Sequence, residues 1–201
     1  MKTEHKATSL LNIRKMTMTA LLGALATVLM FLSFKVPFMP SFISLDFSEL
    51  PALIAAFSMG PLSGAAVCLI KNLINLFASS TGGVGELSNF LLGCCFVLPA
   101  GFIYRYKKTR MGALVGALSG AVLMAVVSAF TNYFIVYPIY TNFLALDAIM
   151  GMYQAINPNV ETLWEALWVF NVPFTFLKGM CSVVITFLVY KKISPLIHGK
   201  K

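Results

Sequence analysis

Long apolar runs, separated by short breaks at proline, glycine or charged residues, follow one another along the 201-residue chain. Most of these runs approach the ~20 residues that a helix needs to cross a hydrocarbon core. The pattern predicts six membrane-spanning helices, near residues 12–34, 48–59, 61–79, 86–104, 112–137 and 164–190. We therefore expect an all-α integral membrane protein in which residues 1–201 form a single membrane domain.

The composition supports this prediction, since 59% of the residues are hydrophobic, 11% are charged and the mean hydropathy is +0.85. A soluble domain of this length would not normally bury so much apolar surface. The polar, basic start of the chain runs into an apolar stretch that is too long for a signal-peptide core and has no small-residue cleavage site before Lys35. We expect that stretch to be a retained helix.

The basic residues predict the orientation of the chain in the membrane. Most of the 15 lysines and arginines fall into three clusters, made up of Lys2, Lys6, Arg14 and Lys15, of Arg105, Lys107, Lys108 and Arg110, and of Lys191, Lys192, Lys200 and Lys201. Cytoplasmic connections of membrane proteins carry such an excess of positive charge. Six crossings would place all three clusters, and hence both termini, on the cytoplasmic side.

Two connections on the predicted outer side are long. The first outer segment, residues 35–50, is too apolar for an ordinary solvated loop and contains Phe38, Phe42, Leu45, Asp46 and Phe47. The second outer segment, residues 142–168, has room for a short amphipathic helix. Long loops in a compact domain are usually functional, often as lids, so we expect the first outer segment to fold back onto the bundle.

Polar side chains inside the predicted helices indicate where a ligand would bind. Lys178 lies thirteen positions before Lys191, or about 20 Å deeper along a helix, where a lysine costs at least ~2.5 kcal/mol unless it faces protein, water or a partner. Asn171, Thr175 and Lys178 follow i, i+4, i+7 spacing and so share one helix face. Further polar residues at depth are Lys71, Asn72, Asn75, Glu86, Asn89 and Asn132.

These groups allow two interpretations. They could simply hydrogen-bond to one another across helices, as amides and hydroxyls do in membrane bundles. Alternatively, several amides beside aromatic rings would suit a flat heterocyclic ligand with an imide edge; the candidate rings are Phe38, Phe42, Phe47, Tyr133 and Trp168. Lys178 has no acid nearby on its own helix, and Lys71 could pair with Glu86 or Asp46 or extend toward the membrane surface.

Signals for catalysis, metals and nucleotides are weak. The chain contains no GxxxxGK[ST] phosphate loop, and "TGGVGEL" lacks the lysine and the preceding strand of one. Both histidines lie in the tails, and Cys68, Cys94, Cys95 and Cys181 have no CxxC spacing, which favours small buried side chains. We expect neither catalytic residues nor a metal site nor a cofactor, which argues against a membrane-embedded enzyme. Ala20 and Ala24, four residues apart, permit close helix approach, within the bundle or at an interface.

Five short motifs, in order, resemble the riboflavin-specific substrate-binding subunit, the S component, of energy-coupling factor (ECF) transporters. They are "LDFSELPALIAAFSMGPLSG" (45–64), "IKNLINL" (70–76), "GGVGELSNFLLG" (82–93), "NYFIVYPIY" (132–140) and "PFTFLKG" (173–179). The resemblance implies a six-helix protein in a prokaryotic plasma membrane that binds riboflavin with high affinity from outside. It also implies a complex with a transmembrane coupling protein and two cytoplasmic ATPases.

The resemblance further implies roles for particular residues. The first outer segment would be a lid, Asn132 and Lys178 would contact the flavin, and Ala20 and Ala24 would dock the coupling protein. The usual "PFNLLKG" of the family has asparagine where this chain has Thr175, so the hydrogen bond expected there would be weaker, water-mediated or made by Asn171. Our full set of candidate substrate-binding residues is Phe38, Phe42, Leu45, Asp46, Phe47, Glu86, Asn89, Asn132, Tyr133, Asn171, Thr175 and Lys178.

Two alternatives within transport stay open at this stage. An S component for another vitamin or a nucleobase would share the architecture and differ only in the polar groups of the site. A stand-alone secondary carrier would work in vesicles without ATP or partner subunits.

Overall fold

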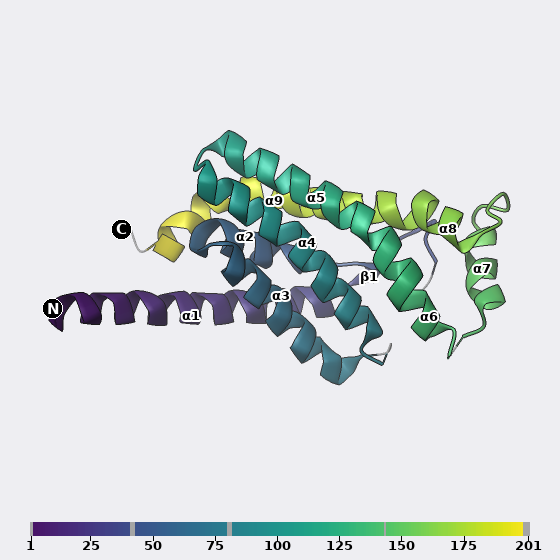
Figure 1. The fold of residues 1–201 in the computed structure, drawn as a ribbon, viewed down its shortest axis with the longest axis horizontal. Coiled ribbons are helices and arrows are strands. Elements are labelled where there is room, and N and C mark those ends of the chain that lie inside the picture. Colours follow the sequence, from purple (N-terminus) through teal and green to yellow (C-terminus); the bar gives the residue numbers. More distant parts are fainter. Residues whose placement is uncertain (1, 41–42, 80–81, 143, 199–201) are drawn as a thin grey trace.

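The computed structural model describes residues 2–40, 43–79, 82–142 and 144–198, and within these ranges the side chains of residues 13–189. The chain forms a bundle of long helices that run back and forth beside one another (Figure 1). The helices and strands are α1 (Lys2–Phe31), β1 (Phe34–Lys35), β2 (Ser44–Leu45), α2 (Glu49–Met59), α3 (Pro61–Asn75), η1 (Leu76–Ala78), α4 (Val84–Tyr106), α5 (Arg110–Thr131), η2 (Asn132–Val136), α6 (Tyr137–Tyr140), α7 (Leu146–Gln154), α8 (Leu163–Ala166), η3 (Leu167–Asn171) and α9 (Val172–His198).

A helical stretch of the structure overlaps each of the six apolar runs. The last two are longer than expected and composite: α5, η2 and α6 form one continuous helical stretch, and α8, η3 and α9 form another. Within the described residues, five helical stretches are long and apolar enough to cross a membrane, whereas the 11-residue α2 is shorter. That the chain crosses the membrane six times therefore stays a prediction.

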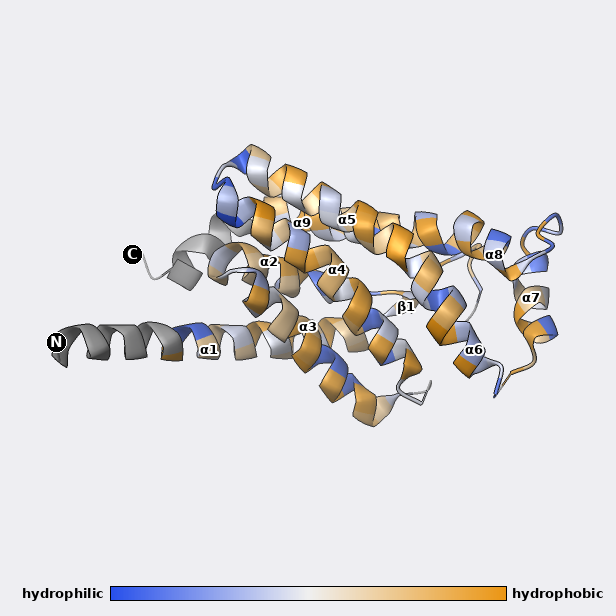
Figure 2. Ribbon diagram, in the orientation of Figure 1, coloured by the Kyte–Doolittle hydropathy of each residue, from blue (hydrophilic) through white to orange (hydrophobic). Residues whose placement is uncertain are grey.

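The two ends of the bundle differ in character. Both termini and the turn between α4 and α5 lie at one end, and the two outer segments lie at the other (Figure 1). The α4–α5 turn is strongly hydrophilic, while the helices of the bundle are mostly hydrophobic (Figure 2). This arrangement brings the described members of the three basic clusters to one end, as their predicted cytoplasmic location requires.

Two glycines are required by their positions in the bundle, one by its backbone conformation and one by the approach of a neighbouring helix. Gly60 turns the chain between α2 and α3 with φ of +104°, a conformation that other residues rarely adopt. In α5, a Cβ added to Gly120 would lie 2.2 Å from the backbone oxygen of Phe96 in α4. A glycine is needed there because α4 and α5 pack backbone to backbone. At the start of α5, Thr109 caps the helix by accepting from the Gly112 amide at 3.0 Å.

The apolar interior has two parts. The inner cluster connects α1, α2, α3, α4, α5 and α9, and it includes Leu22, Leu53, Phe57, Phe96, Val97, Met124 and Val183 together with several alanines. The outer cluster packs α7 and its neighbours against the ends of the long helices, and it consists of Ala129, Tyr137, Ile149, Tyr153, Val160, Ala166 and Leu167. The outer end of the protein thus has an apolar core of its own.

Both outer segments are folded. In the first outer segment, β1 and β2 pair antiparallel, with Phe34 opposite Leu45 and Lys35 opposite Ser44. In the second, the expected short helix is present as α7, which buries Ile149 and Tyr153 against the bundle. The first outer segment thus contains paired backbone, and the second contains the short helix that its sequence predicted.

Candidate functional site

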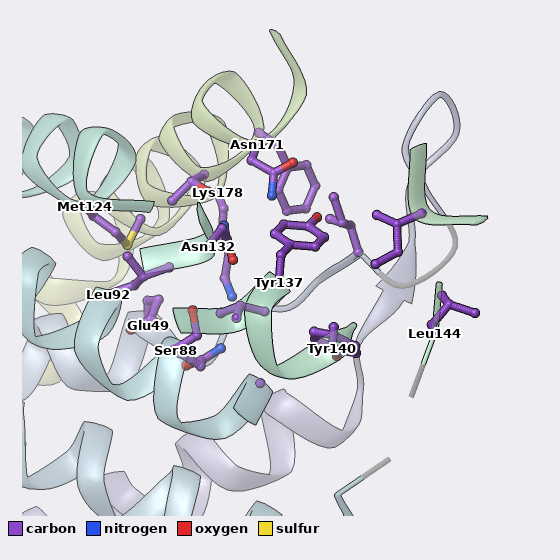
Figure 3. Close-up of a pocket in the computed structure, with 17 residues that line it drawn as sticks. Glu49, Ser88, Leu92, Met124, Asn132, Tyr137, Tyr140, Leu144, Asn171 and Lys178 are labelled. Atoms are coloured by element: carbon purple, nitrogen blue, oxygen red, sulfur yellow. The ribbon is translucent and has the colours of Figure 1, made fainter. Parts of the chain in front are cut away.

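A cavity of about 220 Å³ lies in the half of the bundle that carries the outer segments (Figure 3). Residues of α2, α4, α5, η2, α6, η3, α9 and both outer segments line it: Ile43, Glu49, Gly85, Ser88, Asn89, Leu92, Met124, Asn132, Val136, Tyr137, Tyr140, Leu144, Ile149, Asn171, Phe174, Thr175 and Lys178. Ile43 comes from the first outer segment, and Leu144 and Ile149 come from the second. Both segments therefore contribute to its walls.

Five of the residues predicted to bind substrate are among this lining: Asn89, Asn132, Asn171, Thr175 and Lys178. They come from α4, η2, η3 and α9, which are distant in sequence, so the structure brings the polar groups at depth together around one space. Figure 3 shows Asn132, Asn171 and Lys178 among the side chains that surround the cavity. Their contact with a ligand stays a prediction.

The remaining candidates that the structure describes are not among this lining. Leu45 and Asp46 are buried residues of the first outer segment, Phe47 packs its ring against Phe34 at 6.2 Å, and Phe38 is 83% exposed with φ of +63°. Phe42 lies outside the described residues.

The other two candidates contact different groups. Glu86 is buried and accepts a hydrogen bond from the Ser79 hydroxyl at 2.8 Å. Tyr133 stacks edge-on against Trp164 at 5.2 Å and lines a separate outer groove with it. Trp168, whose ring the sequence also suggested, is 39% exposed and packs edge-on against Trp164. The aromatic side chains that line the cavity are Tyr137, Tyr140 and Phe174 instead.

Two π-helical segments position the amides of the cavity. Asn132 begins η2 and Asn171 ends η3. Such segments are rare and are found frequently at functional sites, because their wider turn changes the direction in which side chains project. Here the two wide turns belong to two different helical stretches that both line the cavity.

Prolines explain where these segments occur. Pro138 and Pro173 each lie two residues after the end of a π-helical segment, so the residue four positions earlier falls inside it. A proline has no N–H to donate to the backbone carbonyl of the residue four positions earlier, and in a regular α-helix its ring clashes with that carbonyl. A widened turn relieves the clash. The sequence carried this signal at both places, as "NYFIVYP" and "LWVFNVP".

A buried ion pair explains how a lysine can lie as deep in the bundle as Lys178 does. Its ammonium lies 2.8 Å from Oδ2 of Asp46, with side-chain exposures of 11% and 6%. The other carboxylate oxygen, Oδ1, accepts from the Ser48 amide at 2.8 Å. Burial alone would raise the pKa of Asp46, but the charges of Lys178 and Lys71 and the hydrogen bonds of Lys178 and Ser48 hold it well below its ordinary value. The carboxylate is therefore charged at physiological pH.

A second ion pair lies beside the first. Lys71 is fully buried and donates to Glu49 Oε1 at 2.7 Å and to Ser48 Oγ at 2.6 Å. The two partners suggested from the sequence, Glu86 and Asp46, were wrong as direct contacts: Asp46 pairs with Lys178, and Glu86 binds Ser79. Sequence reasoning missed Glu49, although an acid in the first turn of an otherwise apolar helix was an available signal.

These groups can recognise a ligand. The polar part of the lining combines three amides, hydroxyls, the Lys178 ammonium and the Glu49 carboxylate, and the rest is mainly aliphatic or aromatic. Within the described residues no group of three histidine, cysteine, aspartate or glutamate side chains could hold a metal ion. Small-molecule sites commonly have this composition, with a few placed polar groups in a mainly apolar wall.

Comparison with known proteins identifies the family. The family model of the substrate-specific component of ECF transporters matches residues 14–190. The chain belongs to this family. The resemblance found from the sequence motifs is therefore confirmed.

Named relatives of this S component agree with each other. It is 32% identical over 181 residues, 90% of each chain, to "Riboflavin transporter RibU" of Staphylococcus aureus (strain TCH60). It is 31% identical to "Riboflavin transporter FmnP" of Bacillus subtilis (strain 168), over 95% of this chain and 97% of the relative. A solved structure of the S component of a bacterial ECF transporter is 30% identical, with a TM-score of 0.74 over 94% of this chain and 99% of that chain.

Proposed function

We propose that this S component captures riboflavin from the outside of a prokaryotic plasma membrane and delivers it through an ATP-driven ECF importer. The observation that carries the proposal is the convergence of Asn89, Asn132, Asn171, Thr175 and Lys178 on one cavity at the end of the bundle opposite the termini. The names of the relatives, which are riboflavin transporters, support it.

The chemistry of the lining fits the chemistry of a flavin. An isoalloxazine ring has an imide edge on which carbonyl acceptors alternate with an N–H donor, and an amide offers both a donor and an acceptor. Tyr137, Tyr140 and Phe174 supply apolar surface for the flat ring system. The Lys178 ammonium has three hydrogens, one of which points to Asp46, so it can also donate to a carbonyl or a ribityl oxygen.

The size of the cavity supports a role for the outer segments in ligand entry. Ligand pockets usually measure about 300–1,000 Å³, whereas this one measures about 220 Å³. A riboflavin molecule therefore needs part of the wall to move. Ile43 in the first outer segment and Leu144 and Ile149 in the second are parts of the wall outside the long helices. We assign the role of a lid to the first outer segment.

Delivery requires partners, which we propose to be a transmembrane coupling protein and two ATPases. The inner cluster fills the bundle below the cavity, so a static S component offers no route onward for the vitamin. Ala20 and Ala24 are exposed on α1, and small residues four apart allow another helix to approach closely. This face of α1 is our proposed docking surface for the coupling protein.

The test is a titration of the purified protein with riboflavin, followed by quenching of flavin fluorescence. We expect saturable one-to-one binding with Kd below about 1 µM, and a yellow protein when the vitamin is retained through purification. Absence of quenching would overturn the proposal. Uptake into vesicles that contain this chain alone, without ATP, would instead identify a stand-alone carrier, and tighter binding of a different vitamin or a nucleobase would reassign the substrate.

A further inference from the structure

Tyr153 is the largest fully buried side chain in the described part of the molecule, with 0% exposure, although it belongs to the short helix α7 of the second outer segment. It is not part of the cavity lining. Its ring packs against Phe170 at 5.4 Å, and its hydroxyl reaches into the bundle. There it contacts two residues that do line the cavity.

The hydrogen bonds of this hydroxyl have a defined direction. Tyr153 Oη lies 2.8 Å from Oδ1 of Asn171 and 2.5 Å from Oη of Tyr137. A phenol has one hydrogen, and an amide oxygen can only accept. Tyr153 must therefore donate to Asn171, and Tyr137 must donate to Tyr153. Burial raises the pKa of Tyr153, since a phenolate there would be poorly solvated, so this donor is retained at physiological pH.

This hydrogen bond holds one end of the Asn171 amide. Oδ1 of Asn171 accepts the single hydrogen of the Tyr153 hydroxyl, and removing that hydroxyl would remove a buried hydrogen bond, which is unfavourable in an apolar surrounding. With Oδ1 held by Tyr153, the Asn171 amide directs its N–H end at the cavity (Figure 3).

We propose that Tyr153 is a positioning residue that holds the Asn171 amide in place, so that this wall of the cavity presents an N–H donor to an acceptor atom of the flavin. The inference rests on the proposed riboflavin binding and adds a determinant of specificity to it. A ligand with a carbonyl or a ring nitrogen at this point is favoured, and a ligand with a donor there leaves buried groups unpaired.

Asn171 is important for the site because the next polar cavity-lining residue along the same helical stretch, Thr175, has no amide. Thr175 lies one turn further along the same stretch and also lines the cavity, but it offers a hydroxyl rather than an amide. Asn171 is therefore the amide that α9 and its π-helical start contribute to the site. The second outer segment, through α7 and Tyr153, thus affects binding from behind the wall.

A double-mutant cycle on riboflavin affinity tests the inference. Tyr153→Phe keeps the ring and removes only the hydroxyl, and we expect it to weaken binding roughly 5- to 30-fold, the effect of one misdirected buried hydrogen bond. Asn171→Ala should weaken binding at least as much. In the Asn171→Ala background, Tyr153→Phe should change the affinity by less than about twofold. Tyr104→Phe, which alters a tyrosine that packs on Phe57 in the inner cluster, is the matched control and should bind like the wild type.

Other outcomes separate the possible failures. If wild type does not bind riboflavin, the proposed function fails. If wild type binds and Tyr153→Phe has no effect, or weakens binding equally in both backgrounds, Tyr153 only packs α7 and the inference is wrong. Asn171→Asp leaves Tyr153 untouched and keeps an acceptor for it but removes the N–H donor. It should bind as weakly as Asn171→Ala, and wild-type affinity of this variant would also overturn the inference, even if Tyr153→Phe failed to fold.

Discussion

The Lys178 ammonium lies 2.8 Å from the Asp46 carboxylate although 132 positions separate the two residues in the chain. One partner belongs to a helix that lines the cavity, and the other belongs to the first outer segment, the proposed lid. A charge that can contact the ligand is therefore already engaged in holding that segment onto the bundle. Binding and the position of the lid share one interaction.

Lys178→Met is expected to weaken riboflavin binding roughly 10- to 150-fold, because a hydrogen bond from a charged donor contributes about 1.5–3 kcal/mol. It should also destabilise the protein by about 3 kcal/mol, since Asp46 would remain buried without its partner. Fluorescence quenching measures the first effect. Denaturant or thermal unfolding in detergent measures the second.

The double variant Asp46→Leu with Lys178→Met separates the two effects. Removing both charges of a buried pair is often nearly neutral, so most of the stability should return while the binding stays weak. Recovery of riboflavin affinity in the double variant would contradict a direct role for Lys178 at the ligand.

Acidification should affect the Asp46 pair only at very low pH. Because the pKa of Asp46 in the folded protein is held below its ordinary value of 3.8, the pair contributes its full stability above that pH. The contribution declines as the pH falls further toward the lower folded-state value. We expect the difference in unfolding temperature between wild type and Asp46→Asn to stay constant from pH 8 to about pH 5. A difference that shrinks within this range would show that the carboxylate is not held in its charged form.

Lys71 and Glu49 should behave as a unit. Lys71→Met alone leaves a buried carboxylate unpaired and should destabilise the protein by about 3–5 kcal/mol. The double variant Lys71→Met with Glu49→Leu, in which both charges are replaced by apolar groups of similar size, should recover most of that loss. Equal destabilisation by the single and the double variant, in unfolding measured by circular dichroism, would contradict this ion pairing.

Pro138→Ala and Pro173→Ala should alter the site without harming the fold. Each change restores an N–H and removes the clash that favours the π-helical turn. A turn that closes to regular α geometry rotates the residues before it by about 100° per displaced residue, which would turn Asn132 or Asn171 away from the cavity. We expect at least a roughly tenfold loss of riboflavin affinity with unchanged or higher thermal stability.

The matched control for these variants is Pro99→Ala in α4, a helix that contains a proline without a π-helical segment. It should leave the affinity unchanged. Wild-type affinity of both the Pro138 and Pro173 variants would show that the wide turns do not orient the amides.

Ala20→Leu with Ala24→Leu should separate binding from transport. Both positions are exposed on α1 and lie away from the cavity lining, so the riboflavin affinity of the purified variant should equal that of wild type. Uptake into vesicles that contain the coupling protein and the ATPases should be lost, because the added bulk prevents close helix approach. Val115→Leu, which adds bulk at an exposed position of α5, should transport normally. Normal uptake by the alanine variant would place the docking surface elsewhere.

The helices and the polar centre of the site could be predicted because both depend on local features of the sequence. Apolar runs determined the helices, and the cost of a polar group in hydrocarbon singled out Asn132, Asn171, Thr175 and Lys178. All four line one cavity. A polar residue deep in an apolar segment reliably indicates a contact with protein, water or ligand, because the same side chain facing hydrocarbon would be unstable.

The partners of these groups could not be predicted in the same way. Glu49 and Asp46 lie three residues apart, and only the path of the first outer segment decides which lysine each one meets. Tyr153 looked like an ordinary residue of an amphipathic helix, and its contact with Asn171 depends on how α7 docks. Phe38, chosen from the sequence for its ring, is not among the residues that line the cavity, because aromatic character alone does not tell which side of a segment faces the bundle.

The alanine-rich inner cluster below the cavity also protects the cell's energy supply. Ala52, Ala55, Ala117 and Ala121 are all fully buried there, and close packing of this kind excludes water. A membrane protein that held a continuous column of water would let protons and sodium ions run down the gradients that power the cell. Because its closely packed inner half leaves no room for such a column, we expect this protein to remain in the membrane in many copies without acting as a leak.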